Sequence, residues 1–356
     1  MRFVLGALAL MIVTPVLADS QLPPREITEA TVSGFIRPTF HDLAGEAGAL
    51  RDQIASLCAS PSKASLAAVQ VAFRSTVVAF SRAEFVRIGP LGVGDRLERL
   101  LFWPDRKGIA LRQVQAALAA KDETATSPGS LSGKSVAMQG LVALEYLLFG
   151  TGAEELAGAD GEYRCRYAAA SSALISELTT MLDREWVDPE GASAHLLSPQ
   201  PDYDDYRTET EVLEKLAATL IHGTEAIRDQ RIAPVLGVAE GAPKPKSALF
   251  WRSGMTVPAL AANFAGLHDY LVATRFAEAI GPTNSWIADG AVFEFENAAR
   301  AIAAIRDAIE VAVSDEEQLR ALKYLVIITG SLDTLLGENL AAALGLSVGF
   351  SQLDGD

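Results

Sequence analysis

The amino-acid sequence predicts an all-α protein of two four-helix bundles that pack side by side. Ala, Leu and Glu recur at helical spacing, and alternating runs of β-branched residues are scarce. Prolines divide the chain into long segments that can be helical. Four such segments precede a stretch rich in Pro, Gly and Ser at 188–204, and four follow it. This pattern is typical of two bundles joined by a linker.

The N-terminus predicts an export signal. Arg2 supplies a positive charge, and Phe3–Val13 is an apolar run too short to span a bilayer. Ala18 offers a small residue for cleavage, and no Cys follows the run that could carry a lipid. An uncleaved membrane anchor is the alternative. We therefore expect residues 1–18 to be a signal peptide, and a periplasmic mature chain with no membrane insertion after cleavage.

The remaining segments follow in order. The first half predicts long helices over 29–58, 62–87, 131–150 and 162–186, with short helices near 94–101 and 107–120. The second half predicts long helices over 206–231, 256–279, 286–312 and 316–343. Pro38 should kink the first helix or delay its start. The predicted domains are 19–187 and 205–356, the second ending in a C-terminal tail, with 188–204 as the linker.

Charge and cysteine content narrow the class of protein. A formal net charge of −15 makes nucleic acid and anionic lipid poor partners. Cys58 and Cys165 are the only cysteines, and an even count in an exported protein predicts a disulfide. Cys58 ends the first predicted helix and Cys165 begins the fourth, so both can lie at one end of an up-and-down bundle. Two buried thiols are the alternative.

Glu145 is the most informative candidate for a functional site. It is the only charge between Lys134 and Glu154, and its helical neighbours are apolar. A carboxylate buried there needs a cation or metal partner, or else it is protonated. A structural Glu–Arg pair between helices fits the residue types equally well. Gly140 costs about 1 kcal/mol against Ala inside a helix, which indicates close approach by another group.

Two segments of the first half supply further cleft candidates. Glu84 lies between Arg82 and Arg87 near the end of the second helix. This segment could provide the cation that Glu145 needs, although surface pairing of Glu84 with Arg87 is the more ordinary interpretation. Trp103 lies in a Phe-Trp-Pro-Asp turn, where it could place an aromatic ring in a cleft or plug a bundle end.

The second half adds three candidate positions. Arg252 precedes a predicted helix, and Asn263 lies within the apolar stretch 257–267 of that helix. A buried amide needs partners, so Asn263 is either a site residue or an inter-helix hydrogen bond. Asp354 and Asp356 stand beside the terminal carboxylate, and together these groups could hold a hard cation or simply fray.

Familiar catalytic machinery is missing from the sequence. It contains no His-Glu-x-x-His pair, Gly-x-Ser-x-Gly elbow, Walker loop, dinucleotide fingerprint or Cys-x-x-Cys-His motif. His222 and Glu225 form a His-x-x-Glu pair, which is too short to be specific. The residue pattern therefore predicts no catalytic residue.

Four segments resemble the imelysin-like family, in the branch of predicted periplasmic proteins and lipoproteins. They are FVRIGP at 85–90, FWPD at 102–105, QGLVALEYLLF at 139–149 and the C-terminal GFSQLDGD. The resemblance covers essentially the whole mature chain. It implies two similar four-helix bundles with a site at their interface, and either metallopeptidase activity or a role in iron uptake.

The family's Gly-x-His-x-x-Glu motif reads Gly140-Leu-Val142-Ala-Leu-Glu145, so Val142 stands where the motif has histidine. Valine can neither bind a metal nor move a proton, and this leaves Glu145 as the motif's only potential ligand. We therefore expect a non-catalytic uptake component that binds iron, another divalent cation or an anionic metal chelate between the bundles. A metallopeptidase is the second hypothesis. A module that docks on an envelope transport or redox partner is the third.

Overall fold

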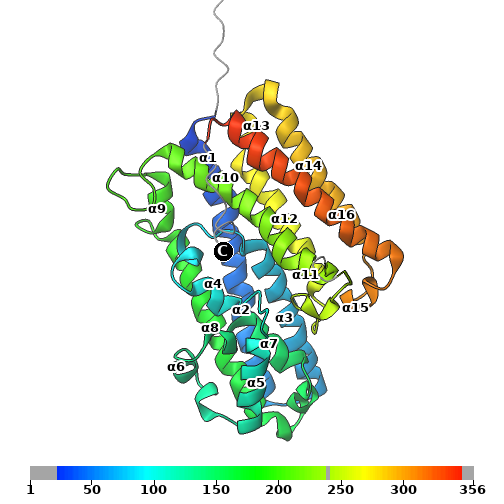
Figure 1. Ribbon diagram of the computed structural model, residues 1–356. Coiled ribbons are helices and arrows are strands. Elements are labelled where there is room, and N and C mark those ends of the chain that lie inside the picture. The colour runs from blue at the N-terminus through cyan, green and yellow to red at the C-terminus, as the bar shows by residue number, and fades with distance from the viewer. Residues whose placement is uncertain (1–21, 238–240, 347–356) are drawn as a thin grey trace, which may run out of the picture.

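The computed structural model describes residues 22–237 and 241–346, and within these ranges the chain is helical with no β-strand (Figure 1). The predicted all-α fold of two helical bundles is confirmed. The predicted signal peptide at 1–18 lies outside the described residues. So do the candidate cation ligands Asp354 and Asp356.

The first bundle forms the lower part of Figure 1. Its long helices are α2 (Arg37–Ala59), α3 (Lys63–Ala83) and α8 (Glu162–Val187), and α7 (Gly140–Phe149) packs against α8 and α3. The chain between α3 and α7 contains the short helices α4 (Arg96–Leu100), α5 (Ile109–Ala120) and α6 (Pro128–Leu131). Phe40, Phe73 and Trp186 of these helices are fully buried.

The second bundle forms the upper part of Figure 1. Its long helices are α10 (Glu209–Ala226), α12 (Thr256–Thr274), α14 (Gly281–Ala303) and α16 (Glu316–Leu332), and its short ones are α11 (Ala233–Leu236), α13 (Phe276–Ala279), α15 (Ile309–Ala312) and α17 (Ala341–Ala343). α10 continues into the π-helix η7 (Ile227–Ile232), and α16 continues into the π-helix η9 (Asp333–Leu340). Arg228 of η7 pairs with Asp333 of η9 at 2.9 Å.

The first helix belongs to both bundles. α1 (Pro24–Thr31), the π-helix η1 (Val32–Ile36) and α2 follow one another without a break. α1 packs against α10 and α12, whereas α2 packs against α3 and α8. The predicted start at residue 29 was therefore late. Pro38 fits because the backbone N–H of Arg37 already bonds five residues back to Val32, so the regular helical ladder is interrupted just before the proline.

The predicted linker 188–204 includes the helix α9 (Ala192–Leu197), which packs against α8 and α1. The helix predicted over 131–150 is shorter than expected, because α7 begins only at Gly140. Gly140 has a left-handed φ of +67° and so cannot lie inside a helix.

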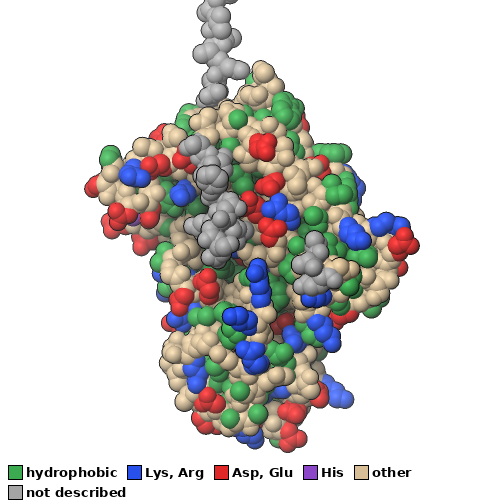
Figure 2. Space-filling model, viewed as in Figure 1, with side chains coloured by type: hydrophobic (Ala, Val, Ile, Leu, Met, Phe, Trp, Pro, Cys, Tyr) green, Lys and Arg blue, Asp and Glu red, His purple; other side chains and the backbone are tan. Residues whose placement is uncertain are grey.

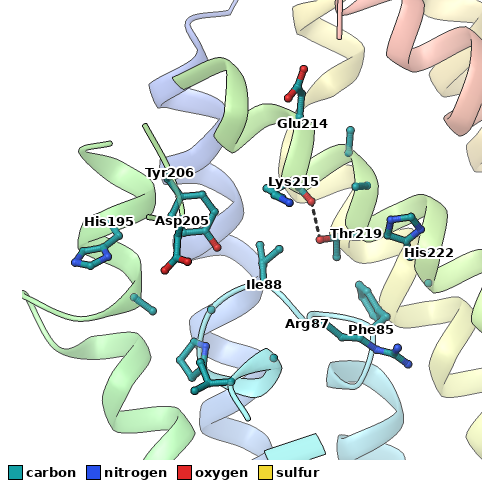
Figure 3. Close-up of a pocket in the computed structure, with 18 of the residues that line it drawn as sticks. Phe85, Arg87, Ile88, His195, Asp205, Tyr206, Glu214, Lys215, Thr219 and His222 are labelled. Carbon is teal, nitrogen blue, oxygen red and sulfur yellow. Dashed lines mark hydrogen bonds between the residues drawn. The ribbon is translucent and has the colours of Figure 1, made fainter. Parts of the chain in front are cut away.

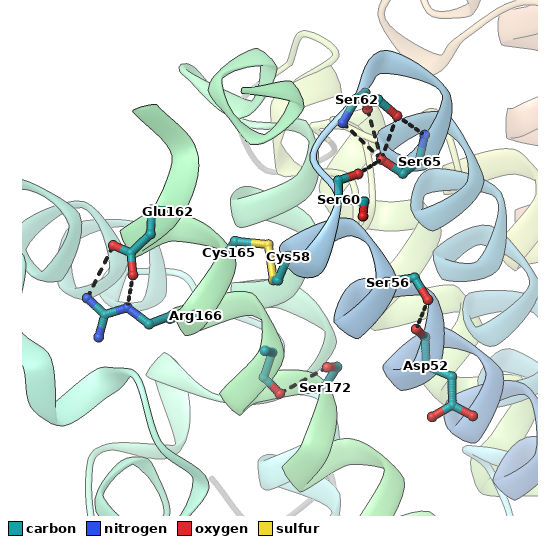
Figure 4. The surroundings of a disulfide bond; sticks show 11 residues. Asp52, Ser56, Cys58, Ser60, Ser62, Ser65, Glu162, Cys165, Arg166 and Ser172 are labelled. Atoms are coloured by element: carbon teal, nitrogen blue, oxygen red, sulfur yellow. Dashed lines mark hydrogen bonds and ion pairs between the residues drawn. A yellow bond between two sulfur atoms is a disulfide. The ribbon is translucent and has the colours of Figure 1, made fainter. Parts of the chain in front are cut away.

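The predicted disulfide is confirmed. Cys58 at the end of α2 is bonded to Cys165 at the start of α8, across 107 residues of sequence (Figure 4). The bond ties together the two helices that make the most extensive contact in the first bundle.

Two helices are long and apolar enough to cross a membrane by length and composition, Lys63–Ala83 and Glu316–Ala343. Both pack within the bundles, α3 against α2 and α12 and α16 against α14. Core helices of soluble proteins pass the same test, so this finding is weak support for a membrane span.

Candidate functional site

The two bundles meet along a seam, where α3 and the segment 84–93 that follows it lie against α10, η7 and α12. Glycine makes this approach possible. A Cβ on Gly266 of α12 would lie 2.8 Å from the carbonyl oxygen of Arg82, and a Cβ on Gly223 of α10 would lie 3.1 Å from the Cβ of Phe85. Side chains in these places would force the bundles apart.

Glu145 crosses the seam from α7. Its side chain is buried, and Oε1 accepts hydrogen bonds from the backbone N–H of Ser253 at 2.9 Å and from its hydroxyl at 2.8 Å. Burial raises the pKa of Glu145, while the bonds from Ser253 and the charge of Arg252 oppose that rise. The hydrogen bonds to Glu145 therefore come from a neutral serine of the second bundle, and the charge of the neighbouring cation Arg252 also acts on the carboxylate.

Arg252 lowers the pKa of Glu145, and its guanidinium is held by aromatic rings. Its guanidinium carbon lies 4.5 Å from the ring centre of Trp251 and 5.4 Å from that of Tyr146. The Tyr146 hydroxyl accepts a hydrogen bond from Gln115 at 2.9 Å, which fixes the ring. Arg252 is therefore a positioned cation at the edge of the buried carboxylate.

The other two motif positions have structural roles. A Cβ on Gly140 would lie within 2.5 Å of the carbonyl oxygens of Arg99 and Leu100, so the predicted close approach is made by backbone. Val142 is half-buried and packs against the hydrophobic core.

A second buried carboxylate crosses the seam at Glu84. Its Oε2 accepts a hydrogen bond from Nη2 of Arg231 at 2.5 Å, and its Oε1 accepts one from Nδ2 of Asn263 at 2.7 Å. The same Nδ2 donates to the carbonyl of Ser81 at 2.7 Å. Asn263 thus makes the inter-helix hydrogen bond that was one of its two predicted roles, and it also contacts the buried carboxylate.

Arg231 is the residue that sequence reasoning missed. It lies in η7, and π-helical turns often mark functional sites. Within the part of the chain that the structure describes, its buried Nε and Nη1 find no hydrogen-bond partner, and neither does Oδ1 of Asn263. Native proteins rarely leave such groups unpaired, so this cluster carries unused hydrogen-bonding capacity.

Trp103 anchors the FWPD turn to the same place. Its indole Nε1 donates to the carbonyl of Gln230 at 3.0 Å, one residue before Arg231. The predicted candidates therefore divide into two groups along the seam. Glu84, Asn263 and Trp103 gather around η7, whereas Gly140, Glu145 and Arg252 lie around the start of α7 and the turn at 250–254.

A cavity of about 1020 Å³ opens beside the Glu84 cluster (Figure 3). It is lined by four parts of the chain that are distant in sequence: Phe85–Val93, the segment from Glu185 to Tyr206, α10, and Leu346. Arg87 lies on its wall. Desolvation by neighbouring protein atoms lowers the pKa of the Arg87 guanidinium, while Glu84 raises that pKa and Arg231 lowers it.

Arg87 therefore does not pair directly with Glu84, as the ordinary interpretation would have it. In the described ranges 22–237 and 241–346 it makes no ion pair within 4.0 Å, and its side chain stays exposed to the cavity. Among the same residues, no group of three or more His, Cys, Asp or Glu side chains is arranged to hold a metal ion. His222, on the cavity wall, pairs with Glu225 at 3.1 Å.

Comparison with known proteins identifies the fold and the family. An imelysin-like protein from Psychrobacter arcticum 273-4 has a similar structure, with a TM-score of 0.76 and 19% identity over 92% of this chain and 98% of that chain. A protein described as a putative iron-regulated protein A precursor, from Parabacteroides distasonis ATCC 8503, has a TM-score of 0.74 and 15% identity over 91% of this chain and 96% of that chain. No curated protein sequence matches the chain. The Imelysin family model (peptidase M75) matches residues 36–335, and the chain therefore belongs to the imelysin family.

Proposed function

We propose that the protein is a non-catalytic binding component of metal uptake in the bacterial envelope, and that its ligand is an anionic iron chelate held where the two bundles meet. The observation that carries this proposal is Arg87. It is a partly desolvated guanidinium without an ion-pair partner among the described residues, on the wall of a cavity of about 1020 Å³. An unpaired guanidinium can bind a carboxylate through two parallel charge-assisted hydrogen bonds.

A chelate fits better than a bare ion. A bare iron ion needs several carboxylate, imidazole or thiolate ligands, and the described residues bring no three of these together. A chelate brings its own metal ligands and presents carboxylate oxygens to the protein. Figure 2 supports an anionic ligand, because Lys and Arg side chains gather across the middle of this face, between the two bundles, on a chain whose net charge is −15.

Two further observations support iron as the metal and the bacterial envelope as the location. One structural relative bears a name that refers to iron regulation. Residues 1–18 have the pattern of a secretory signal, which would deliver the mature chain to the periplasm. A docking role with a transport or redox partner is compatible with this proposal, because a binding protein must hand its ligand on.

The imelysin family name also carries peptidase activity, and no observation at the motif favours it here. Val142 offers only hydrocarbon where the family motif has histidine, and Glu145 is occupied by Ser253. We therefore propose no hydrolytic step.

Calorimetry on the mature chain, residues 19–356, tests the proposed function. Ferric citrate should bind, and Arg87→Ala should weaken it about 10- to 100-fold, the loss expected for one charge-assisted contact. Arg184→Ala is the matched control, because Arg184 is exposed and does not line the cavity. Absence of heat with ferric citrate, Fe(II), Fe(III) and citrate alone would overturn the proposal. Equal binding of citrate with and without iron would show that the ligand need not contain iron.

A further inference from the structure

The wall of the cavity that faces Arg87 is acidic. Asp204 and Asp205, from the end of the segment between the bundles, line the cavity and are exposed to it. Neither makes an ion pair within 4.0 Å among the residues that the structure describes, whereas Glu185 on the same wall is paired with Arg96 at 2.8 Å. Asp204 and Asp205 are therefore two cavity carboxylates without an ion-pair partner in the described part of the chain.

These charges are separated in space. In Figure 3, Asp205 and Tyr206 stand on one side of the cavity, and Arg87, Phe85 and His222 stand on the other. Lys215 of α10 lies between the two sides and can offset at most one of the two aspartate charges. Opposite charges at opposite walls give the cavity two chemically different ends.

Tyr206 stands next to Asp205 on this wall (Figure 3). Tyr206 is buried, and burial together with the charge of Asp205 raises the pKa of its hydroxyl to about 12. Tyr206 is thus a neutral phenol at physiological pH, and it does not alter the negative charge that Asp204 and Asp205 give to this end of the cavity. A ligand with only negative groups would bring them toward Asp204 and Asp205, which costs free energy through like-charge repulsion.

We propose that the cavity binds a ligand with two charged ends, a carboxylate end at Arg87 and a protonated amine end at Asp204 and Asp205. This inference rests on the proposed function and narrows it: the chelator keeps a free ammonium group in addition to its metal-binding carboxylates. The size of the cavity agrees, since about 1020 Å³ is at the upper limit of ordinary small-molecule sites and has room for both ends.

Two ferric chelates that differ in one arm provide the test. Ferric nitrilotriacetate carries carboxylates only, and ferric Nα,Nα-bis(carboxymethyl)-L-lysine has the same chelating head with an aminobutyl arm. Calorimetry on residues 19–356 should show about tenfold or greater preference for the lysine chelate, the effect of one charge-assisted contact. Acetylation of its amine should abolish the preference.

Variants assign the two ends. Asp204→Asn/Asp205→Asn should lower the affinity for the lysine chelate to that for ferric nitrilotriacetate. Arg87→Ala should lower the affinity for both chelates by a similar factor. Asp202→Asn is the matched control, because Asp202 is exposed in the same segment but does not line the cavity. Equal affinity of the unmodified protein for the two chelates, or a preference that survives in the Asn variant, would overturn this inference and leave the proposed function intact. Failure of every ferric chelate to bind would overturn both.

Discussion

The buried carboxylate of Glu145 accepts two hydrogen bonds from a single residue, Ser253, which lies in the opposite bundle. The donors are the backbone N–H at 2.9 Å and the hydroxyl at 2.8 Å. The family motif is thus used here to fasten one bundle to a turn of the other. Glu84 does the same at another point of the seam, through Arg231 and Asn263.

Removal of the Ser253 hydroxyl should destabilise the protein. Ser253→Ala deletes one of the two donors to a buried carboxylate, and we expect the free energy of unfolding to fall by about 1–3 kcal/mol. Urea denaturation followed by circular dichroism measures this. Ser314→Ala, at an exposed position, should change it by no more than about 0.5 kcal/mol. An equal effect of the two substitutions would contradict the role assigned to Ser253.

The stability conferred by Glu145 should depend on pH. Burial raises its pKa above the usual 4.5, so the folded protein holds this proton more tightly than the unfolded chain does. The contribution of Glu145 is therefore full below about pH 4.5 and is lost as the pH rises through the raised pKa. Glu145→Gln has no charge to bury, so its stability relative to the wild type should increase between about pH 5 and about pH 7.5. Denaturation curves at the two pH values measure the difference, and a constant difference would show that Glu145 does not titrate in this range.

The Glu84–Arg231 pair should show strong energetic coupling. Arg231→Met leaves the carboxylate of Glu84 buried with Asn263 as its remaining donor, and should cost about 3–5 kcal/mol. The double variant Glu84→Gln/Arg231→Met buries no charge and should cost less than the sum of the single variants. The exposed pair of Arg25 with Glu29 is the control, and Arg25→Ala should cost less than about 1 kcal/mol. Additive costs in a double-mutant cycle would argue against a shared buried network.

Two glycines allow backbone strain to be separated from steric clash. Gly140 and Gly254 both have left-handed φ values, +67° and +71°. A Cβ on Gly254 meets nothing within 4 Å, whereas one on Gly140 meets two carbonyl oxygens within 2.5 Å. Gly254→Ala should therefore cost about 1–2 kcal/mol, from conformation alone, and Gly140→Ala should cost clearly more. Thermal unfolding of the two variants gives the comparison, and similar melting temperatures would refute the clash.

The disulfide should contribute substantially to stability. It joins two residues that are 107 positions apart, and for a loop of this size the chain-entropy model gives about 4–5 kcal/mol. Cys58→Ser/Cys165→Ser should therefore melt at a lower temperature than the wild type. Reductant should lower the melting temperature of the wild type and leave that of the double variant unchanged. A wild type that is insensitive to reductant while unfolding would show that the bond is unimportant or inaccessible.

Sequence reasoning succeeded where a residue conflicted with its local surroundings. Asn263 is an amide in an apolar stretch, and it was expected to need partners, which Glu84 and Ser81 provide. Gly140 was expected to mark a close approach, and the backbone of Arg99 and Leu100 makes it. Each of these residues is costly without a specific partner, so the residue type alone predicted that a partner exists.

The identity of those partners was not predictable. Ser253 is a common residue at a turn, and nothing in its neighbourhood indicates that it caps a carboxylate 108 positions earlier. Arg231 lies in a π-helical turn, where the 3.6-residue pattern that orients side chains does not hold. The sequence likewise predicted a long first helix, but periodicity could not show that its two ends pack in different bundles.

The helix Pro24–Ala59 gives the molecule an unusual order of assembly. The ribosome makes this helix early, yet the ring of Phe35 packs against that of Tyr270, with ring centres 5.4 Å apart. Tyr270 is synthesised more than two hundred positions later. The N-terminal part of this helix must therefore wait for the latter part of the chain before its apolar surface is covered, whereas α2 is covered by α3 and α8 of the first half. Cleavage of the chain between the bundles would not yield two independently folded halves, because the first half would keep α1, which packs against α10 and α12 of the second half.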